Sequence, residues 1–488
     1  MMMIIPALRA SRLSIRRALP IFGLRHSPPC KTLQRLWVHS LERKDITSSH
    51  HHAGQMVDLP KDESLTKLPP TEINNTSLSI LPLRMIIRSL FITSISSSTA
   101  LQSAIIRTLL MLAYAENAIL NPDRNPFLHL LLKKTFYAQF CAGETPAEVR
   151  LTMASLKDIG FSGVILTYAK EAVLSEGEAN VTAGYGSSKE TAHDITSEIE
   201  PWTKGTLETI KLAGPGDYVA LKLTGSGRLA MENLSQDKGP SPYLKKSMHN
   251  ICTLAQQRGV RLIFDAEQDA FQKGIDTWTM AFARTYNTAE TATVYGTYQA
   301  YRKVTSATIS RHLAEAQLGG FTLGVKLVRG AYLGSDPREC FHDTKAETDT
   351  CYNAIAATVL RRQWGEFTKG KGAFPNAHVI LATHNAESIR QARVICDAGN
   401  AKSGIVFAQL QGMADEVSCE LIRSNSSTKS VILPAYKYLV WGTTGECMKY
   451  LLRRAYENQD AVQRTQSGRD AMWVEVVRRG KRAAGFAS

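Results

Sequence analysis

The chain has 488 residues, 44% of them hydrophobic, which is the composition of a globular protein with a sizeable core. Its eight cysteines are scattered and form no C-x-x-C pair, so the sequence excludes a zinc framework of paired cysteines and a disulfide-dense scaffold. The net charge of +14 is compatible with a nucleic-acid or anionic-membrane partner, and its distribution along the chain bears on that choice.

Residues 1–41 contain seven Lys and Arg and no acidic residue, interspersed with Leu, Ile and Ser. This composition predicts a mitochondrial transit peptide. Its removal would leave a mildly basic protein, so we expect no nucleic-acid partner. Residues 42–83 mix charged residues, Ser, Thr, Asn and Pro without periodicity, and they predict a disordered linker.

Residues 84–135 are mostly apolar, but Arg88 and Arg107 interrupt them. The uninterrupted stretches are shorter than the roughly 20 residues that span a bilayer. They therefore predict an N-terminal helical arm that packs on the main domain or lies on a membrane, and not a transmembrane span.

From about residue 160, short runs rich in β-branched residues alternate with longer helical patterns, which argues for parallel βαβ units. The expected strands are Gly163–Ala169, Tyr218–Thr224, Arg261–Asp265, Thr293–Tyr301, Thr322–Val328, His378–Thr383, Ile405–Gln409 and Ser430–Tyr438. Eight such units predict a (βα)8 TIM-like barrel over 136–465, with an insertion near 172–200 and a C-terminal tail over 466–488. A doubly wound sheet is the alternative, but the nearest glycine motif, Gly225–Ala230, follows the second strand and not the first.

In such a barrel, function is built at the carboxyl ends of the strands. Polar side chains recur there, at Lys222, Asp265, Gln299, Lys326, Arg329, His384, Gln409 and Tyr438. The cations among them predict an anionic ligand. We expect no metal site, because His384 has no partner at ligand spacing and the cations outnumber the carboxylates. Lys222 could instead form a Schiff base with a carbonyl substrate, which makes a lyase barrel the alternative of another class.

The stretch Tyr438–Asn458 begins as an apolar strand, turns at Gly442 and continues as a helix. Its adjacent Arg453 and Arg454 suit a small carboxylate, since each guanidinium can make two parallel hydrogen bonds. The alternative is a solvated helix face on which Glu457 pairs with both arginines. Arg453 lies about two turns, roughly 12 Å, beyond the strand, so the arginines reach the site only if this helix lies over the C-terminal face of the barrel.

Several motifs follow one another from about residue 136 to 460, namely FYAQFCAGET, VALKLTG, LIFDAEQ, YQAYRK, VKLVRGAY, ATHN, FAQLQGM and YLLRRAYEN. Together they resemble the proline dehydrogenase family in its eukaryotic mitochondrial form. The resemblance implies a distorted (βα)8 barrel with non-covalent FAD that oxidises L-proline to Δ1-pyrroline-5-carboxylate. It also implies ubiquinone as electron acceptor and peripheral association with the matrix side of the inner mitochondrial membrane.

Carried over by motif, the resemblance implies that Arg453, Arg454 and Lys222 bind the proline carboxylate, with Glu457 orienting the arginine pair. The residues that would wall the substrate ring are Asp265, Leu327, Tyr332 and Tyr438. Lys326 would lie near flavin N5, where a cation stabilises negative charge. The residues that would contact FAD are Gln299, Val328, Gly330, Thr383, His384, Asn385 and Gln409.

The chain departs from the family pattern at two places. Thr167 stands where the family usually has Asp, and Val440-Trp441 precede Gly442 in place of the usual Pro-Tyr. Because Val440-Trp441 lie beside Tyr438, a preference for hydroxyproline or another cyclic imino acid stays open. Tyr438 itself favours proline, since a smaller residue there would admit a ring hydroxyl.

Overall fold

The computed structural model describes residues 76–97, 99–113, 115, 117–170, 189–425, 431–460 and 462–485, without the side chains of 99–101 and 456–465. All of them belong to one compact unit, Pro70–Ser488. The predicted transit peptide, most of the predicted linker and residues 172–188 of the predicted insertion lie outside the described residues. The remainder of that insertion forms α8 (Ala192–Asp194) and η6 (Ile195–Ile199).

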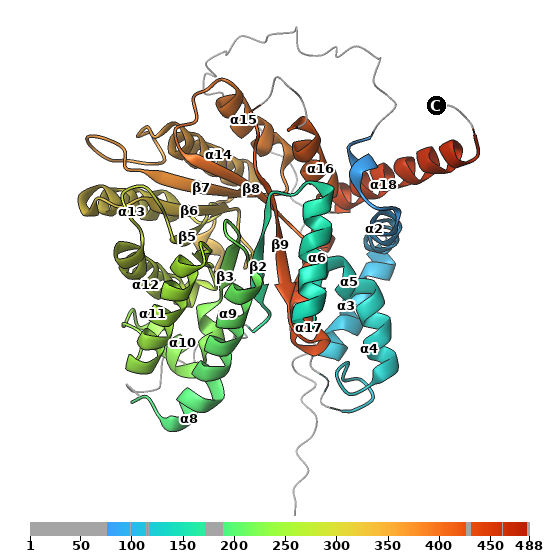
Figure 1. Cartoon of the computed structure of the whole chain (residues 1–488), viewed down its shortest axis with the longest axis horizontal. Coiled ribbons are helices and arrows are strands. Elements are labelled where there is room, and N and C mark those ends of the chain that lie inside the picture. The colour runs from blue at the N-terminus through green and yellow to red at the C-terminus, as the bar shows by residue number, and fades with distance from the viewer. Residues whose placement is uncertain are drawn as a thin grey trace, which may run out of the picture. The chain divides into compact units, whose positions relative to one another are not determined.

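Eight parallel strands of the described chain close into a barrel (Figure 1). They are β2 (Gly163–Tyr168), β3 (Tyr218–Leu221), β4 (Arg261–Phe264), β5 (Val294–Gln299), β6 (Leu323–Val328), β7 (Ala377–Ala382), β8 (Gly404–Leu410) and β9 (Ala435–Trp441). Because β9 pairs with both β8 and β2, the sheet has no free edge there, and the doubly wound alternative is wrong. A short ninth strand, β1 (Cys141–Gly143), pairs with β9 but is not one of the eight barrel strands.

The eight predicted strands are all present, but the last begins at Ala435 and not at Ser430. Pro434 immediately precedes it and has no backbone N–H to donate to a neighbouring strand, although its carbonyl accepts a hydrogen bond from the Phe407 backbone N at 2.9 Å. The strand then continues to Trp441, three residues beyond the predicted end.

Helices surround the barrel on its outer side (Figure 1). They are α6 (Pro146–Ile159), α9 (Glu200–Leu212), α10 (Arg228–Ser235), α11 (Pro242–Gln257), α12 (Asp269–Tyr286), α13 (Thr305–Gly319), α14 (Lys345–Arg361), α15 (Ala386–Asp397) and α16 (Asp415–Ser424). Strand residues alternate between two faces, so one set of apolar side chains packs against these helices and the other fills the barrel. At the N-terminal end, Tyr218 packs edge-on against Tyr295 and Tyr436, with ring centroids 5.3 and 5.6 Å away. These rings close that end, which leaves the C-terminal end for a site.

The N-terminal arm is helical, as the sequence predicts. It contains η3 (Ser77–Ile80), α2 (Leu83–Ser96), α3 (Thr99–Ala113), α4 (Pro126–Leu132), η4 (Lys133–Tyr137) and α5 (Ala138–Phe140). Regular structure begins before the predicted end of the linker at residue 83, because Leu78 and Leu81 are buried against α16 and α18 (Val462–Ala483). Most of the predicted C-terminal tail belongs to α18, which packs along α2.

The last barrel helix, α17 (Thr444–Asp460), lies beyond the end of β9 and packs against α3 (Figure 1). Its buried Cys447, Met448 and Leu451 form one apolar cluster with inward-facing strand residues such as Ile165 and Tyr438. This helix therefore covers the C-terminal end of the barrel and does not pack outside the strands. The displacement that the arginine pair requires is present.

Candidate functional site

Two carboxylates from the N-terminal arm and its connection to the barrel hold the start of α17. Glu144 accepts hydrogen bonds from the backbone N and the Oγ1 of Thr444, both at 2.8 Å. Asp123 accepts from the Gly445 backbone N at 2.8 Å. Negative groups at a helix N-terminus satisfy its free N–H groups and oppose the positive end of its dipole. The segment FYAQFCAGET thus serves to position α17, because Tyr137 also donates to the Gly442 carbonyl at 2.7 Å.

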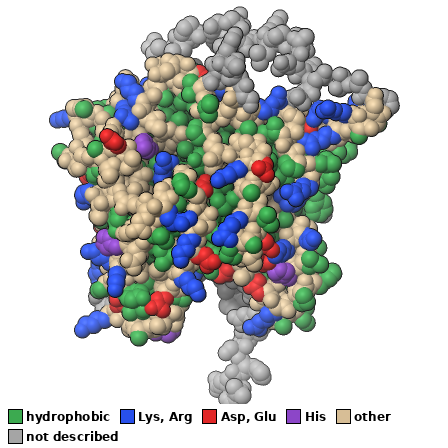
Figure 2. All heavy atoms as spheres, in the orientation of Figure 1, with side chains coloured by type: hydrophobic (Ala, Val, Ile, Leu, Met, Phe, Trp, Pro, Cys, Tyr) green, Lys and Arg blue, Asp and Glu red, His purple; other side chains and the backbone are tan. Residues whose placement is uncertain are grey.

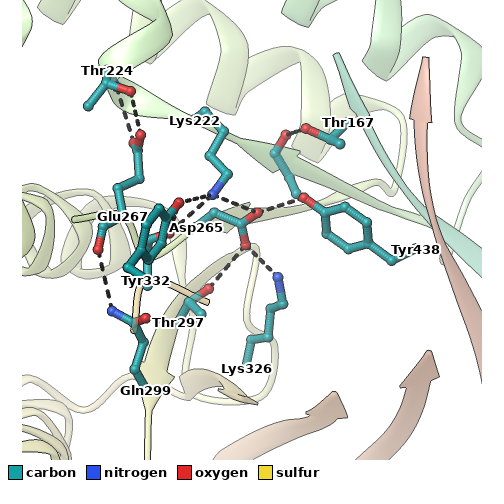
Figure 3. Close-up of polar contacts among 12 residues, drawn as sticks. Thr167, Lys222, Thr224, Asp265, Glu267, Thr297, Gln299, Lys326, Tyr332 and Tyr438 are labelled. Carbon is teal, nitrogen blue, oxygen red and sulfur yellow. Dashed lines mark hydrogen bonds and ion pairs between the residues drawn. The ribbon is translucent and has the colours of Figure 1, made fainter. Parts of the chain in front are cut away.

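Asp265, directly after β4, is the centre of a polar cluster at the ends of the barrel strands (Figure 3). Its Oδ1 accepts from Lys326 Nζ at 2.5 Å and from Thr297 Oγ1 at 3.3 Å. Its Oδ2 accepts from Tyr438 OH at 2.7 Å and lies 3.9 Å from Lys222 Nζ. Four different strands or strand ends therefore converge on one carboxylate, which is the arrangement expected of a barrel active site.

The electrostatics of this cluster follow from its burial. Burial raises the pKa of the Asp265 carboxyl, but the ammonium groups of Lys326 and Lys222 outweigh it and hold that pKa below its ordinary value. Burial also lowers the pKa of Lys326, against the opposing effect of Asp265. Burial and the nearby Asp265 carboxylate raise the pKa of Tyr438 well above its ordinary value, so its hydroxyl stays protonated and donates.

Lys222 and Tyr332 meet at the edge of this cluster, from the end of β3 and the loop after β6 (Figure 3). Lys222 Nζ donates to Tyr332 OH at 3.0 Å and to the Ala266 carbonyl at 3.1 Å. Tyr332 is buried, and its ring lies 5.6 Å from the ammonium. The structure thus brings together Lys222, Asp265, Lys326, Tyr332 and Tyr438 from the predicted set.

Both arginines of the pair are on α17. The Arg454 side chain is buried, and its guanidinium lies 4.9 Å from the centre of the Tyr450 ring. Tyr450 belongs to the apolar cluster that α17 shares with the barrel interior, so Arg454 is not part of a solvated face. Arg453 is half-buried. The side chain of Glu457 lies outside the described residues, so its predicted role stays a prediction.

The predicted flavin contacts lie along the ends of β5 to β8. Gln299 is in register with Val328 and donates to the Glu267 carbonyl at 3.4 Å. Three residues follow β7, where Thr383 Oγ1 accepts from Arg329 at 2.6 Å, His384 Nε2 accepts from the Leu410 backbone N at 3.1 Å, and Asn385 caps α15. Gly330 has φ +144° and lies against the Tyr301 ring, where an added Cβ would come within 2.1 Å of a ring carbon. Only glycine fits this position.

Two predicted residues point away from the site. Leu327 follows Lys326 on β6, and strand alternation turns its side chain outward into the core between strands and helices. Gln409 likewise faces α16, where its Oε1 accepts from Ser418 Oγ at 3.0 Å. The prediction that Leu327 walls the substrate ring is therefore wrong. The Gln409 side chain links α16 to the end of β7, because its Nε2 also donates to the Thr383 carbonyl at 3.3 Å.

Several residues of the cluster were not among the predicted ones. Thr297, on β5, donates a hydrogen bond to Asp265. Its position two residues before Gln299 on the same strand could have identified it from the sequence. Glu267 accepts from the Thr224 backbone N at 3.1 Å and so fixes the loop that follows Lys222 (Figure 3). Thr167 and Val440, the two inward-facing departures from the family pattern, are direct partners across β2 and β9.

The residues at the C-terminal face fit a flavin dinucleotide. Gln411, just after β8, is buried, and its amide oxygen has no hydrogen-bond partner among the described residues. Buried polar atoms without partners are uncommon, and a polar ligand would satisfy this one. Within the cluster, the buried Lys326 ammonium supplies a cation. Within the described ranges, no group of three or more His, Cys, Asp and Glu is placed to hold a metal ion.

The sequence and fold match known proteins. The family model for proline dehydrogenase matches residues 149–467. A protein of Schizosaccharomyces pombe, named probable proline dehydrogenase, mitochondrial, is 30% identical over 404 residues, which cover 73% of this chain and 80% of that protein. The chain belongs to the proline dehydrogenase family. It is accordingly an oxidoreductase, and the family supports proline oxidation.

Other proline dehydrogenase relatives differ in the substrate that their names state. Hydroxyproline dehydrogenase of Rattus norvegicus is 28% identical over 394 residues, covering 72% of this chain and 82% of that protein. A crystal structure of proline utilization A from Bdellovibrio bacteriovorus, inactivated by N-propargylglycine, matches with a TM-score of 0.55 at 18% identity. That match covers 77% of this chain and 38% of the other, and it supports the fold alone.

Proposed function

We propose that this protein oxidises L-proline to Δ1-pyrroline-5-carboxylate with bound FAD. The observation that carries the proposal is the buried cluster of Asp265, Lys326, Tyr438 and Lys222 beneath a helix that bears two arginines. Bound FAD would accept a hydride from proline C5, and the ring nitrogen would lose a proton. The product is the cyclic imine, and two electrons pass to the flavin.

The residues of this chain would bind and orient the substrate. Arg454 and Arg453 would take the proline carboxylate in parallel hydrogen bonds, and Lys222 would add a third cation. Tyr438 and Tyr332, both buried, would bound the ring and keep water out. Holding the substrate in one orientation next to the acceptor reduces the entropic part of the barrier.

The residues that would hold FAD lie on the ends of β5 to β7 and the loops that follow. They are Gln299, Lys326, Val328, Gly330, Thr383, His384 and Asn385. The backbone at Gly330 would permit close approach, and Lys326 would stabilise negative charge on the reduced ring. Gln411, with its unsatisfied amide oxygen, joins this set.

We also propose that the protein works at the matrix side of the inner mitochondrial membrane and passes its electrons to ubiquinone. Relatives from Schizosaccharomyces pombe and Caenorhabditis elegans are named mitochondrial, and residues 1–41 have the composition of a transit peptide. No helix among the described residues is long and apolar enough to cross a bilayer. We propose that attachment is peripheral.

The arm offers a surface suited to that attachment. Large apolar side chains are exposed on α2 (Leu83, Ile87, Phe91), α4 (Phe127, Leu130, Leu131) and α18 (Trp473, Val474). Residues 76–135 hold six Lys and Arg against two acidic residues, which suits an anionic lipid surface. In Figure 2, hydrophobic and basic side chains lie together over the edge where Figure 1 places α2, α3 and α4. Sedimentation with phosphatidylcholine vesicles, with and without phosphatidylserine, tests this surface, and an Ile87→Asp/Phe91→Asp variant should stay in solution.

The experiment that tests the function uses flavin colour. Purified full-length protein supplied with FAD should be yellow, and L-proline should bleach its absorption in the absence of oxygen. A colourless protein that does not take up FAD, or a yellow one that proline leaves unchanged, contradicts the proposal. Trapping of a substrate on Lys222 by borohydride would instead support the lyase alternative.

Hydroxyproline is the alternative substrate, because relatives named hydroxyproline dehydrogenase match about as much of the chain as those named proline dehydrogenase. The Tyr438 ring, whose hydroxyl donates to Asp265, takes up space in the site. This favours proline, which is smaller than hydroxyproline. Steady-state kcat/KM for proline and for hydroxyproline with one quinone acceptor decides between them.

A further inference from the structure

The loop between β6 and α14, residues 329–344, carries Tyr332, which accepts a hydrogen bond from Lys222 at the edge of the polar cluster (Figure 3). All of this loop is described, and it contains one helical turn, η8 (Arg338–Cys340). Long loops with little regular structure inside a compact domain are usually functional. We term residues 329–344 the lid.

The segment that follows β5 holds the lid near both of its ends. Near the start of the lid, Tyr301 OH accepts from the Tyr332 backbone N at 3.3 Å, and the Tyr301 ring lies against Gly330. Near its end, the Phe341 ring stacks on Tyr301 with centroids 4.4 Å apart, and the Tyr301 carbonyl accepts from the His342 backbone N at 2.8 Å. These contacts join neutral groups, so they do not depend on pH near neutrality.

The middle of the lid is held by a charged group instead. Asp336, whose backbone N donates to the Tyr332 carbonyl at 3.0 Å, accepts a hydrogen bond from the Asp269 backbone N at the start of α12. Arg302, from the segment after β5, is 8% exposed and forms an ion pair with the Asp269 carboxylate. The buried Oδ2 of Asp336 has no hydrogen-bond partner among the described residues. One guanidinium therefore faces two carboxylates and bonds directly to one of them.

The second carboxylate makes this contact sensitive to protons. Burial raises the pKa of Asp336 to about 6, and the Asp269 carboxylate adds to the rise, against the opposing effects of Arg302 and the Asp269 backbone N. Tyr301 and Cys340 also lie near Asp336, but the pKa of each is raised, so both stay neutral near pH 6. A water molecule can satisfy Oδ2, but it cannot balance the second negative charge.

The direction of the pH effect follows from the exposure of Asp336 in an open lid. Opening would return its pKa towards the ordinary, lower value, so the closed lid binds the proton more tightly than the open one. Above pH 6 the carboxylate is charged in both states, and the closed lid carries the whole cost of burying it. As pH falls below 6, the closed lid takes up a proton and that cost is removed. Between pH 7 and pH 5 the ratio of closed to open lid should rise about tenfold.

We infer that Asp336 is a positioning residue, and that its uptake of a proton holds the lid closed with Tyr332 in place at the substrate ring. The role of Tyr332 rests on the proposed function, whereas the closure of the lid does not. Asp336 acts through the backbone that it shares with Tyr332 and does not touch the substrate. The site would thus bind proline more tightly in mildly acidic solution than at neutral pH.

The test compares the FAD-loaded full-length protein with its Asp336→Asn variant. An asparagine amide mimics the neutral carboxyl, because its oxygen can accept from the Asp269 backbone N and its NH2 group can donate to the Asp269 carboxylate. In the unaltered protein, hydrogen-exchange protection of the lid amides, corrected for the chemical rate at each pH, should be about tenfold higher at pH 5 than at pH 7. In the variant it should be high at both. The KM for proline should rise severalfold from pH 5 to pH 7 in the unaltered protein and stay low in the variant.

Glu339→Gln is the matched control, because Glu339 is exposed on η8 of the same lid, and it should behave as the unaltered protein. Asp276→Asn tests a second carboxyl near Arg302, whose pKa burial also raises to about 6 but which is on α12 and outside the lid. A pH dependence that persists in Asp336→Asn overturns the inference, and its loss in Asp276→Asn alone would assign it to α12. Hydrogen exchange needs no turnover, so bleaching of the flavin by proline tests the proposed function separately.

Discussion

Lys326 and Asp265 form a buried ion pair, with Nζ 2.5 Å from Oδ1 and the two side chains only 7% and 5% exposed. The family resemblance assigns Lys326 to the flavin and Asp265 to the substrate ring. Because the two groups are in direct contact, the charge on one changes the pKa of the other. The cofactor side and the substrate side of the site are therefore electrostatically coupled. The Lys326 ammonium also lies 4.7 Å from the centre of the Tyr438 ring, which extends this coupling to the substrate wall.

Asp265→Asn should move the alkaline limb of the pH profile towards neutral pH. Burial and Lys222 lower the pKa of Lys326, while Asp265 raises it, so removal of the carboxylate charge leaves only the two lowering effects. Lys326 then loses its proton at a lower pH than in the unaltered protein. We expect kcat/KM for proline to fall on the alkaline side at a pH about one unit or more lower.

Asp349→Asn is the control for that shift, because Asp349 pairs with Arg329 and Lys345 and not with Lys326. Its alkaline limb should stay in place. An Asp265→Asn profile with the alkaline limb of the unaltered protein would separate Lys326 from the pH-dependent step.

Arg454→Ala should raise the KM for proline about 100-fold, because truncating one partner of a buried charged contact costs roughly 2–5 kcal/mol. The Arg454 side chain is buried beside Tyr450, so the lost guanidinium cannot be replaced by a mobile surface cation. Arg454→Lys keeps the charge but loses the two parallel hydrogen bonds, and we expect about a tenfold increase. FAD content, measured by absorption, should equal that of the exposed control Arg390→Ala. A KM unchanged in both Arg454 variants would return Arg454 to a structural role.

The sequence predicts the barrel well because short runs rich in β-branched residues alternate with helix-length segments along the chain. It predicts the faces of the strands less well. Leu327 and Gln409 were assigned from motifs in which every second residue points outward, and a motif does not say which one. By contrast, the displacement of α17 could be predicted, because Arg453 and Arg454 reach the site only if this helix lies over the C-terminal face of the barrel. The residues that achieve it, Glu144 and Asp123, lie some 300 positions earlier in the chain, where no local pattern connects them to that helix.

Glu475→Gln should loosen the contact of α18 with the arm. The Glu475 side chain is fully buried and accepts hydrogen bonds from Arg478, Arg479 and Thr76. Burial raises its pKa, but these hydrogen bonds outweigh burial and lower the pKa to about 2. A depressed carboxyl pKa gives stability that is present above the ordinary value and lost as pH falls towards 2.

In the unaltered protein, backbone amides of α18 should therefore stay protected from hydrogen exchange at pH 5 and lose that protection well before the barrel does on acidification. In the Glu475→Gln variant, α18 should already be less protected near neutral pH. The free energy of opening this helix should fall by on the order of 3 kcal/mol, the cost of breaking a buried ion pair. Asp470→Asn is the matched control, because Asp470 pairs with Arg469 at an exposed position of the same helix. Equal protection of α18 in both variants contradicts this role for Glu475.

Glu144→Gln should lower kcat/KM for proline although Glu144 is not one of the proposed substrate contacts. Its carboxylate accepts from the Thr444 backbone and side chain, and hydrogen bonds from Lys133 and Thr444 hold its pKa below the ordinary value in spite of burial. It is therefore charged at neutral pH and opposes the helix dipole at the start of α17. Loss of such a cap costs about 0.5–2 kcal/mol, which would let α17 shift its arginines and reduce kcat/KM severalfold to about tenfold.

Glu148→Gln is the control for this argument. Glu148 shares Lys133 with Glu144 and accepts a hydrogen bond from the Glu144 backbone N, but it does not contact Thr444. If both variants lose the same activity, the effect belongs to Lys133 and not to the anchoring of α17.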